Sequence, residues 1–78
     1  MSTPIRKMVV SIESPPDREK LVAGLLYEDE QWAEVNQEFG VLHLEIYPRR
    51  DGQPWRFSFD EAFTALQAAK HRLIGGTQ

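Results

Sequence analysis

The strongest constraint on the fold of this chain is one amphipathic helix near its C-terminal end. Ser58-Phe59-Asp60-Glu61 forms a capping box, in which the Ser58 hydroxyl accepts a hydrogen bond from the Glu61 amide and the Glu61 carboxylate reaches back to the amide of Ser58. Gly75-Gly76 supplies a C-cap. We therefore predict a helix over about 59–74, and its apolar stripe comprises Phe59, Ala62, Phe63, Leu66, Ala69 and Leu73.

The segments before this helix show the alternation of apolar and polar residues that is typical of β-strands. Ser14-Pro15-Pro16-Asp17 ends the first of them, because proline cannot donate to a strand ladder. Glu38-Phe39-Gly40 closes a hairpin with glycine in the left-handed position. We predict strands at about 5–13, 21–28, 32–37 and 41–47, and a short edge strand at about 55–57 is a further candidate.

The segment Leu21 to Tyr27 leaves two interpretations open. A helix is favoured by Ser14 as a cap and by Pro15 in the first turn. A strand is favoured because Gly24 would cost a helix about 1 kcal/mol. The acids of Glu28-Asp29-Glu30 would also lie in the later part of that helix, where the macrodipole disfavours them.

We favour the strand, and the fold class is then α+β. The expected architecture is an antiparallel meander of about four strands with one C-terminal helix packed on one face. The helix interpretation of the ambiguous segment would give a β-α-β-β-α arrangement instead.

A single helix covers only one face of such a sheet. We assign Leu42, Leu44 and Ile46 to the helix side by their alternation. The opposite face would then be partly apolar, and an apolar patch left open on a small protein usually marks a partner surface. The residues that we expect on this open face are Val9, Leu25 or Leu26, Trp32, Val41 and Tyr47.

Composition narrows the classes of function. The 78 residues contain no cysteine, and the net charge is −3. The stretch from Leu21 to Pro48 holds six acidic residues and no Lys or Arg, which disfavours nucleic acid as a ligand and suits a basic protein partner. The same charges also suit a solvated hairpin face. Met1 to Ile12 lacks a signal-peptide pattern and no segment resembles a membrane span, so we expect a cytoplasmic protein.

The turn between Tyr47 and Phe57 is the densest cluster of residue types found at binding sites. Arginine and tryptophan on a projecting loop are typical of protein interfaces and could also bind single-stranded nucleic acid. Alternatively, the aromatic residues fold back over the start of the helix and the arginines are merely solvated. Together with Trp32 of the open face, the candidate binding residues are Tyr47, Arg49, Arg50 and Trp55.

Catalytic and metal chemistry find little support in the sequence. His43 and His71 are the only histidines, fewer ligands than a zinc site needs. Ser58 already has a capping role, and no phosphate-binding loop or nucleophile motif is present. We therefore expect no metal, no cofactor and no enzymatic activity.

The run Leu44-Glu45-Ile46-Tyr47-Pro48-Arg49-Arg50-Asp51-Gly52-Gln53-Pro54-Trp55, followed by the capped helix, resembles small, mostly uncharacterised bacterial α+β proteins. Some proteins of this kind are immunity proteins or antitoxins, so the resemblance implies a bacterial binding protein. The expected function is a small protein-binding module of immunity or regulatory type. The alternatives are a structural homodimer, and a small-ligand binder or enzyme with a pocket between sheet and helix.

Overall fold

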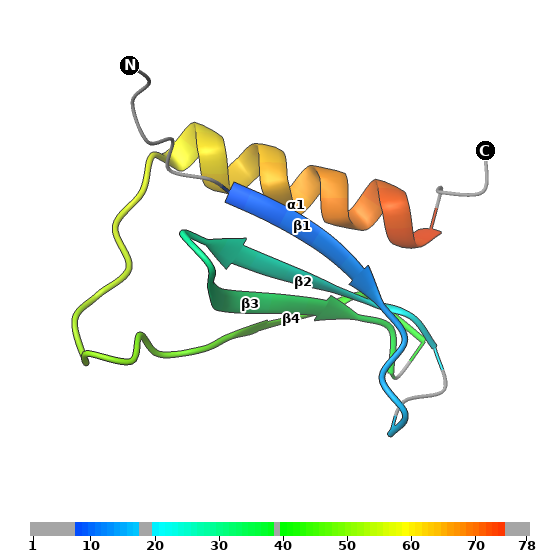
Figure 1. Cartoon of the computed structure of the whole chain (residues 1–78). Coiled ribbons are helices and arrows are strands. Elements are labelled where there is room, and N and C mark those ends of the chain that lie inside the picture. Colours follow the sequence, from blue (N-terminus) through cyan, green and yellow to red (C-terminus); the bar gives the residue numbers. More distant parts are fainter. Residues whose placement is uncertain (1–7, 18–19, 39, 75–78) are drawn as a thin grey trace, which may run out of the picture.

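The computed structural model describes residues 8–17, 20–38 and 40–74. Four strands precede one helix along the chain: β1 (Met8–Glu13), β2 (Val22–Tyr27), β3 (Glu30–Asn36), β4 (His43–Ile46) and α1 (Phe59–Ile74). The strands form one antiparallel sheet in the order β1-β2-β3-β4, and α1 packs on one face of it (Figure 1). The predicted α+β meander is confirmed.

The segment Val22–Tyr27 is a strand, so its interpretation as a helix is wrong. It pairs with β1 on one side and β3 on the other, which makes it a central strand with four buried residues. The residues between β2 and β3 form a tight turn, in which Glu28 and Asp29 have φ angles of 53° and 70°. Positive φ at both central residues is the signature of a type I′ hairpin turn.

A β-bulge in the β2–β3 pair decides where Trp32 lies. Leu25 pairs with Ala33 but Leu26 pairs with Gln31, so Trp32 is an extra residue on β3. The bulge breaks the alternation of faces. Trp32 is only 4% exposed, and its indole Nε1 donates to the sulfur of Met8 at 3.2 Å. The prediction that Trp32 lies on the open face is therefore wrong, because strict alternation does not continue through a bulge.

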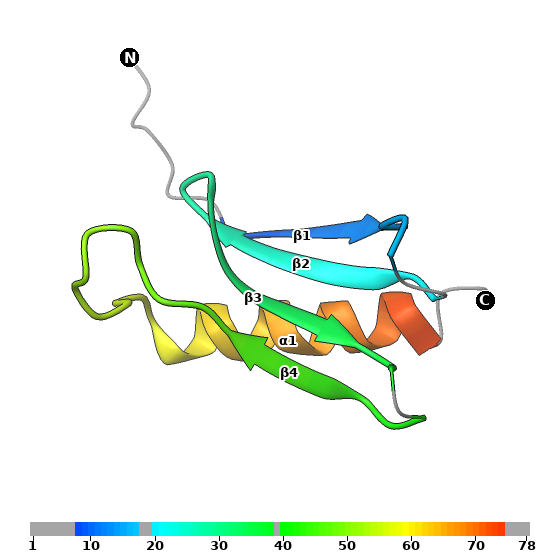
Figure 2. The same ribbon diagram turned by 90° about the horizontal axis from the view of Figure 1, so that it is seen from below.

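The helix approaches the sheet through small residues. Ala65 and Ala69 of α1 are its buried positions, and they join Leu25, Ala33 and Val35 in the core. Small side chains let α1 lie close to β1 and β2, and it meets β3 only marginally. Among the described residues, α1 has no close backbone contact with β4, which lies at the edge of the sheet (Figure 2).

The predicted cap of α1 is present, but part of its predicted apolar stripe is not in the core. The amide of Glu61 donates to Ser58 Oγ at 3.0 Å, as the capping box requires. The side chains of Ala62, Leu66 and Leu73 pack against the core, whereas Phe59 and Phe63 are 78% and 52% exposed. The predicted C-cap at Gly75-Gly76 lies outside the described residues.

Several strand bounds differ from the sequence prediction. The second and third strands, predicted at 21–28 and 32–37, span Val22–Tyr27 and Glu30–Asn36, and residues 5–7 of the first predicted strand lie outside the described residues. The last strand is shorter than 41–47, because Val41 lies in the bend that contains Gly40 with φ of 83° and Leu42 precedes the first residue paired with β3. Residues 55–57 are not a strand. Instead, the ring of Phe57 packs against Trp32 and Tyr27 with centroid distances of 4.8 and 5.0 Å, and this contact closes one end of the core.

Candidate docking surface between the helix and the last strand

The face of the sheet away from α1 is polar at its centre. Asn36 is 1% exposed, and its amide donates at 3.1 Å to one carboxylate oxygen of Glu34 and to one of Glu45. The hydroxyl of Tyr47 donates to the other oxygen of Glu34 at 3.3 Å. This network joins β3 to the end of β4. Of the apolar residues predicted on this face, Trp32 and Leu25 are core residues instead, whereas Val9 and Leu26 are cross-strand neighbours on it.

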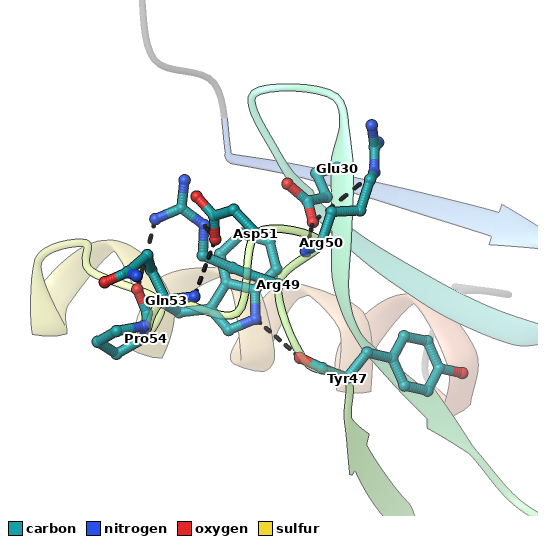
Figure 3. Close-up of polar contacts among 8 residues, drawn as sticks. Glu30, Tyr47, Arg49, Arg50, Asp51, Gln53 and Pro54 are labelled. Carbon is teal, nitrogen blue, oxygen red and sulfur yellow. Dashed lines mark hydrogen bonds and ion pairs between the residues drawn. The ribbon is translucent and has the colours of Figure 1, made fainter.

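The loop after β4 is held by its own aromatic residue (Figure 3). Trp55 is half-buried, and its indole Nε1 donates to the carbonyl of Tyr47 at 2.8 Å. The guanidinium carbon of Arg49 lies 5.4 Å from the centre of the Trp55 ring. The contacts of Trp55 show that this side chain folds back onto the chain, which favours the structural interpretation of the tryptophan over a projecting binding residue.

Arg50 is the one member of the candidate set that extends into solvent. Its backbone amide donates to Glu30 Oε2 at 2.7 Å, which ties the loop to the start of β3. Its guanidinium Nε lies 3.9 Å from the same oxygen while the side chain is 81% exposed. An ion pair this exposed adds little stability. The structure thus brings Tyr47, Arg49 and Trp55 together, with Arg50 beside them and Trp32 in the core.

Among the described residues, several exposed large apolar side chains belong to α1 and β4. Leu44 and Ile46 of β4 are 46% and 63% exposed although they point to the helix side, because α1 does not reach across to them. The rings of Phe59 and Phe63 stack with centroids 6.0 Å apart on the uncovered flank of the helix. The groove between these elements is lined by Val35, Leu42, His43, Leu44, Phe63, Leu66, Gln67 and Lys70.

In the part of the chain that the structure describes, no strand pairs with the outer side of β4. The amide of Tyr47 donates to the carbonyl of Trp32 at 2.9 Å, so the backbone groups of Tyr47 point toward β3. Because these directions alternate along a strand, the N–H and C=O groups of Leu44 and Ile46 point away from the sheet. The other edge of the sheet is covered differently, since the guanidinium of Arg72 donates to the carbonyl of Val10 at 2.9 Å.

We call the exposed side chains of Leu44, Ile46, Phe59 and Phe63, together with the free backbone edge of β4, the α1–β4 surface. Proteins usually protect such an edge with lysine, proline or a covering segment. Between Val41 and Tyr47 the sequence has neither lysine nor proline. The combination of apolar side chains and unpaired backbone groups is the arrangement to which an added strand binds.

The sequence pattern does not predict this surface, because alternation places Leu44 and Ile46 under the helix and helical spacing places Phe63 in the same apolar stripe as the core residues. A signal was present in the composition of the helix. Ala65 and Ala69, the residues of closest approach, lie on one flank of a broad apolar stripe, and Phe59 and Phe63 lie on its other flank with Leu66 between them. Contact with the sheet through the alanine flank leaves the phenylalanine flank exposed.

Comparison with protein families, curated proteins and solved structures gave no match to this chain. Among the described residues, no group of His, Cys, Asp or Glu is arranged to hold a metal ion. Within the same residues, no helix has the length and apolar character needed to cross a membrane.

Proposed function

We propose that this chain is a small protein-binding module that docks another polypeptide at the α1–β4 surface. The proposal is carried by one observation: apolar side chains of β4 and α1 are uncovered next to an edge strand with free backbone groups. A partner segment in extended conformation would continue the sheet beyond β4. Its side chains on the helix side would enter the groove beside Leu44 and Phe63.

Two kinds of interaction would act together in this docking mode. Backbone hydrogen bonds to Leu44 and Ile46 give affinity without regard to sequence. Burial of the four apolar side chains contributes at about 25 cal/mol per Å² of apolar area removed from water. The acid-rich face on the other side of β4, where Glu45 is exposed, would favour partner segments with basic side chains on that face.

Selection of binding peptides from a random display library tests this proposal. We expect the selected peptides to bind the wild-type chain and to lose about tenfold or more in affinity for Ile46→Lys. Val9→Lys is the matched control, because Val9 is also exposed, at 39%, but lies on β1. Peptides that bind Ile46→Lys as well as wild type would show that docking uses a different surface.

A further inference from the structure

We propose that the occupant of the α1–β4 surface is a second copy of this chain, paired through β4 about a two-fold axis at Leu44. The inference rests on the proposed docking at this surface and names the partner. Two β4 strands related by such an axis run antiparallel. The result would be one continuous eight-stranded sheet, with four strands from each copy.

The hydrogen-bonding directions of β4 allow this axis. The N–H and C=O groups of Leu44 face outward, so two copies of Leu44 can exchange both hydrogen bonds across the axis. The same register places Leu42 opposite Ile46 of the second copy. Leu42 and Ile46 both lie on the helix side of the sheet by alternation with Leu44. The apolar side chains of the two edges therefore meet one another.

The charges on the other face select this register over its nearest competitor. With the axis at Leu44, His43 lies opposite Glu45 of the second copy, and an imidazole can donate to a carboxylate. With the axis at Glu45, the two Glu45 side chains would lie directly opposite each other. Each already neighbours Glu34 on β3. Like charges directly opposite one another are destabilising, so the Leu44 register is preferred.

The symmetry also joins the two apolar grooves. The two-fold axis runs perpendicular to the sheet, so both helices lie on the same face of the joined sheet. Phe63 lines the groove between α1 and β4 and stacks on Phe59, so this flank of α1 lies toward β4 and faces the axis. An isologous contact of this kind closes after two copies and leaves no further open β4 edge.

The first test is the association state of the full chain. Analytical ultracentrifugation at tens to hundreds of micromolar should show a monomer–dimer equilibrium for wild type. Ile46→Lys should raise the dimer dissociation constant about tenfold or more, and Val9→Lys should leave it unchanged. A wild-type chain that stays monomeric throughout this range would overturn the proposal, and so would equal dissociation constants for wild type and Ile46→Lys.

The second test reads the register directly, because the chain has no cysteine of its own. Hydrogen-bonded antiparallel pairs have Cα atoms about 5.5 Å apart, within the usual disulfide range. Leu44→Cys should therefore form a covalent dimer with itself on mild oxidation. A mixture of Leu44→Cys and Ile46→Cys that yields mainly the mixed dimer would place the axis at Glu45 and overturn the Leu44 register.

These results separate the two proposals. If the chain is monomeric but the selected peptides lose affinity for Ile46→Lys, the dimer proposal fails and the docking proposal stands. If the chain is monomeric and the selected peptides bind Ile46→Lys as tightly as wild type, both proposals fail. A dimer cross-linked through Leu44→Cys would support both.

Discussion

Glu34 and Glu45 are direct cross-strand neighbours on β3 and β4, and the amide of Asn36 lies within 3.1 Å of an oxygen of each. Two carboxylates in this position repel one another. Asn36 offsets the repulsion by donating to both, and its own oxygen accepts from the amide of Glu38 at 3.2 Å. The buried side-chain amide of Asn36 thus provides hydrogen-bond partners for both carboxylates at the centre of the face away from α1.

Replacement of this amide should be costly. We expect Asn36→Ala to lower the free energy of unfolding by about 1–3 kcal/mol, because the almost buried Glu34 loses a donor. Asn36→Asp should cost more, since it adds a third carboxylate to the cluster. Urea unfolding measures both variants, and Gln37→Ala is the control from outside the network. An Asn36→Ala midpoint equal to that of the control would contradict this account of the polar face.

The two tryptophans should differ in their access to solvent. Trp32 is 4% exposed, whereas Trp55 is half-buried at the loop. Acrylamide should therefore quench the Trp55→Phe variant, which retains Trp32, less than the Trp32→Phe variant. Trp32→Ala should lower the free energy of unfolding by about 3–5 kcal/mol. Stronger quenching of Trp32 than of Trp55 would place Trp32 on the surface and contradict the bulge.

The turn between β2 and β3 should be open to stabilisation. Asp29 has a φ of 70°, a conformation that glycine adopts at less cost. We expect Asp29→Gly to raise the free energy of unfolding by about 0.5–1 kcal/mol. Asp17→Gly removes the same charge from a turn residue with negative φ and should not stabilise. A lower urea midpoint for Asp29→Gly than for wild type would count against the type I′ turn.

Phe63 should contribute little to the fold of the isolated chain. Because its side chain is 52% exposed, Phe63→Ala should cost about 1 kcal/mol in the free energy of unfolding of the monomer. Leu25→Ala, at a fully buried position, should cost about 2–5 kcal/mol. The unfolding of both variants should be measured at low protein concentration, where the chain is monomeric. If Phe63→Ala proves as destabilising as Leu25→Ala, the ring packs in the core and α1 lies closer to β4.

The architecture could be predicted from sequence because local signals agree with the final contacts. The Ser58 N-cap and the left-handed Gly40 act within a few residues, and both are present in the structure. Trp32 could not be placed in this way. Its position depends on how β2 and β3 pair around a bulge, and Glu28-Asp29 lacks the glycine that normally signals a type I′ turn.

The candidate site was harder to predict than the fold. The sequence pattern of apolar residues in a strand is the same whether or not a helix covers them. Leu44 and Ile46 are uncovered because Ala65 and Ala69 draw α1 toward β1 and β2, and this lateral position of the helix is a tertiary property. The turn between Tyr47 and Phe57 carries residue types that are common at interfaces, but the hydrogen bond from Trp55 to the carbonyl of Tyr47 gives that tryptophan a structural role.

β4 pairs with β3 on one side and, among the described residues, has no close backbone contact with α1, so we expect it to open at a lower free energy than the other strands. In native-state hydrogen exchange its amides should therefore lose protection well before those of β2, which has a neighbour on each side. Any chain that docks along β4 supplies the missing second ladder and favours the closed state by mass action. The pairing of β4 with β3 and the binding of a partner to β4 are thus linked equilibria. Binding would therefore order the part of the sheet that we expect to be least stable.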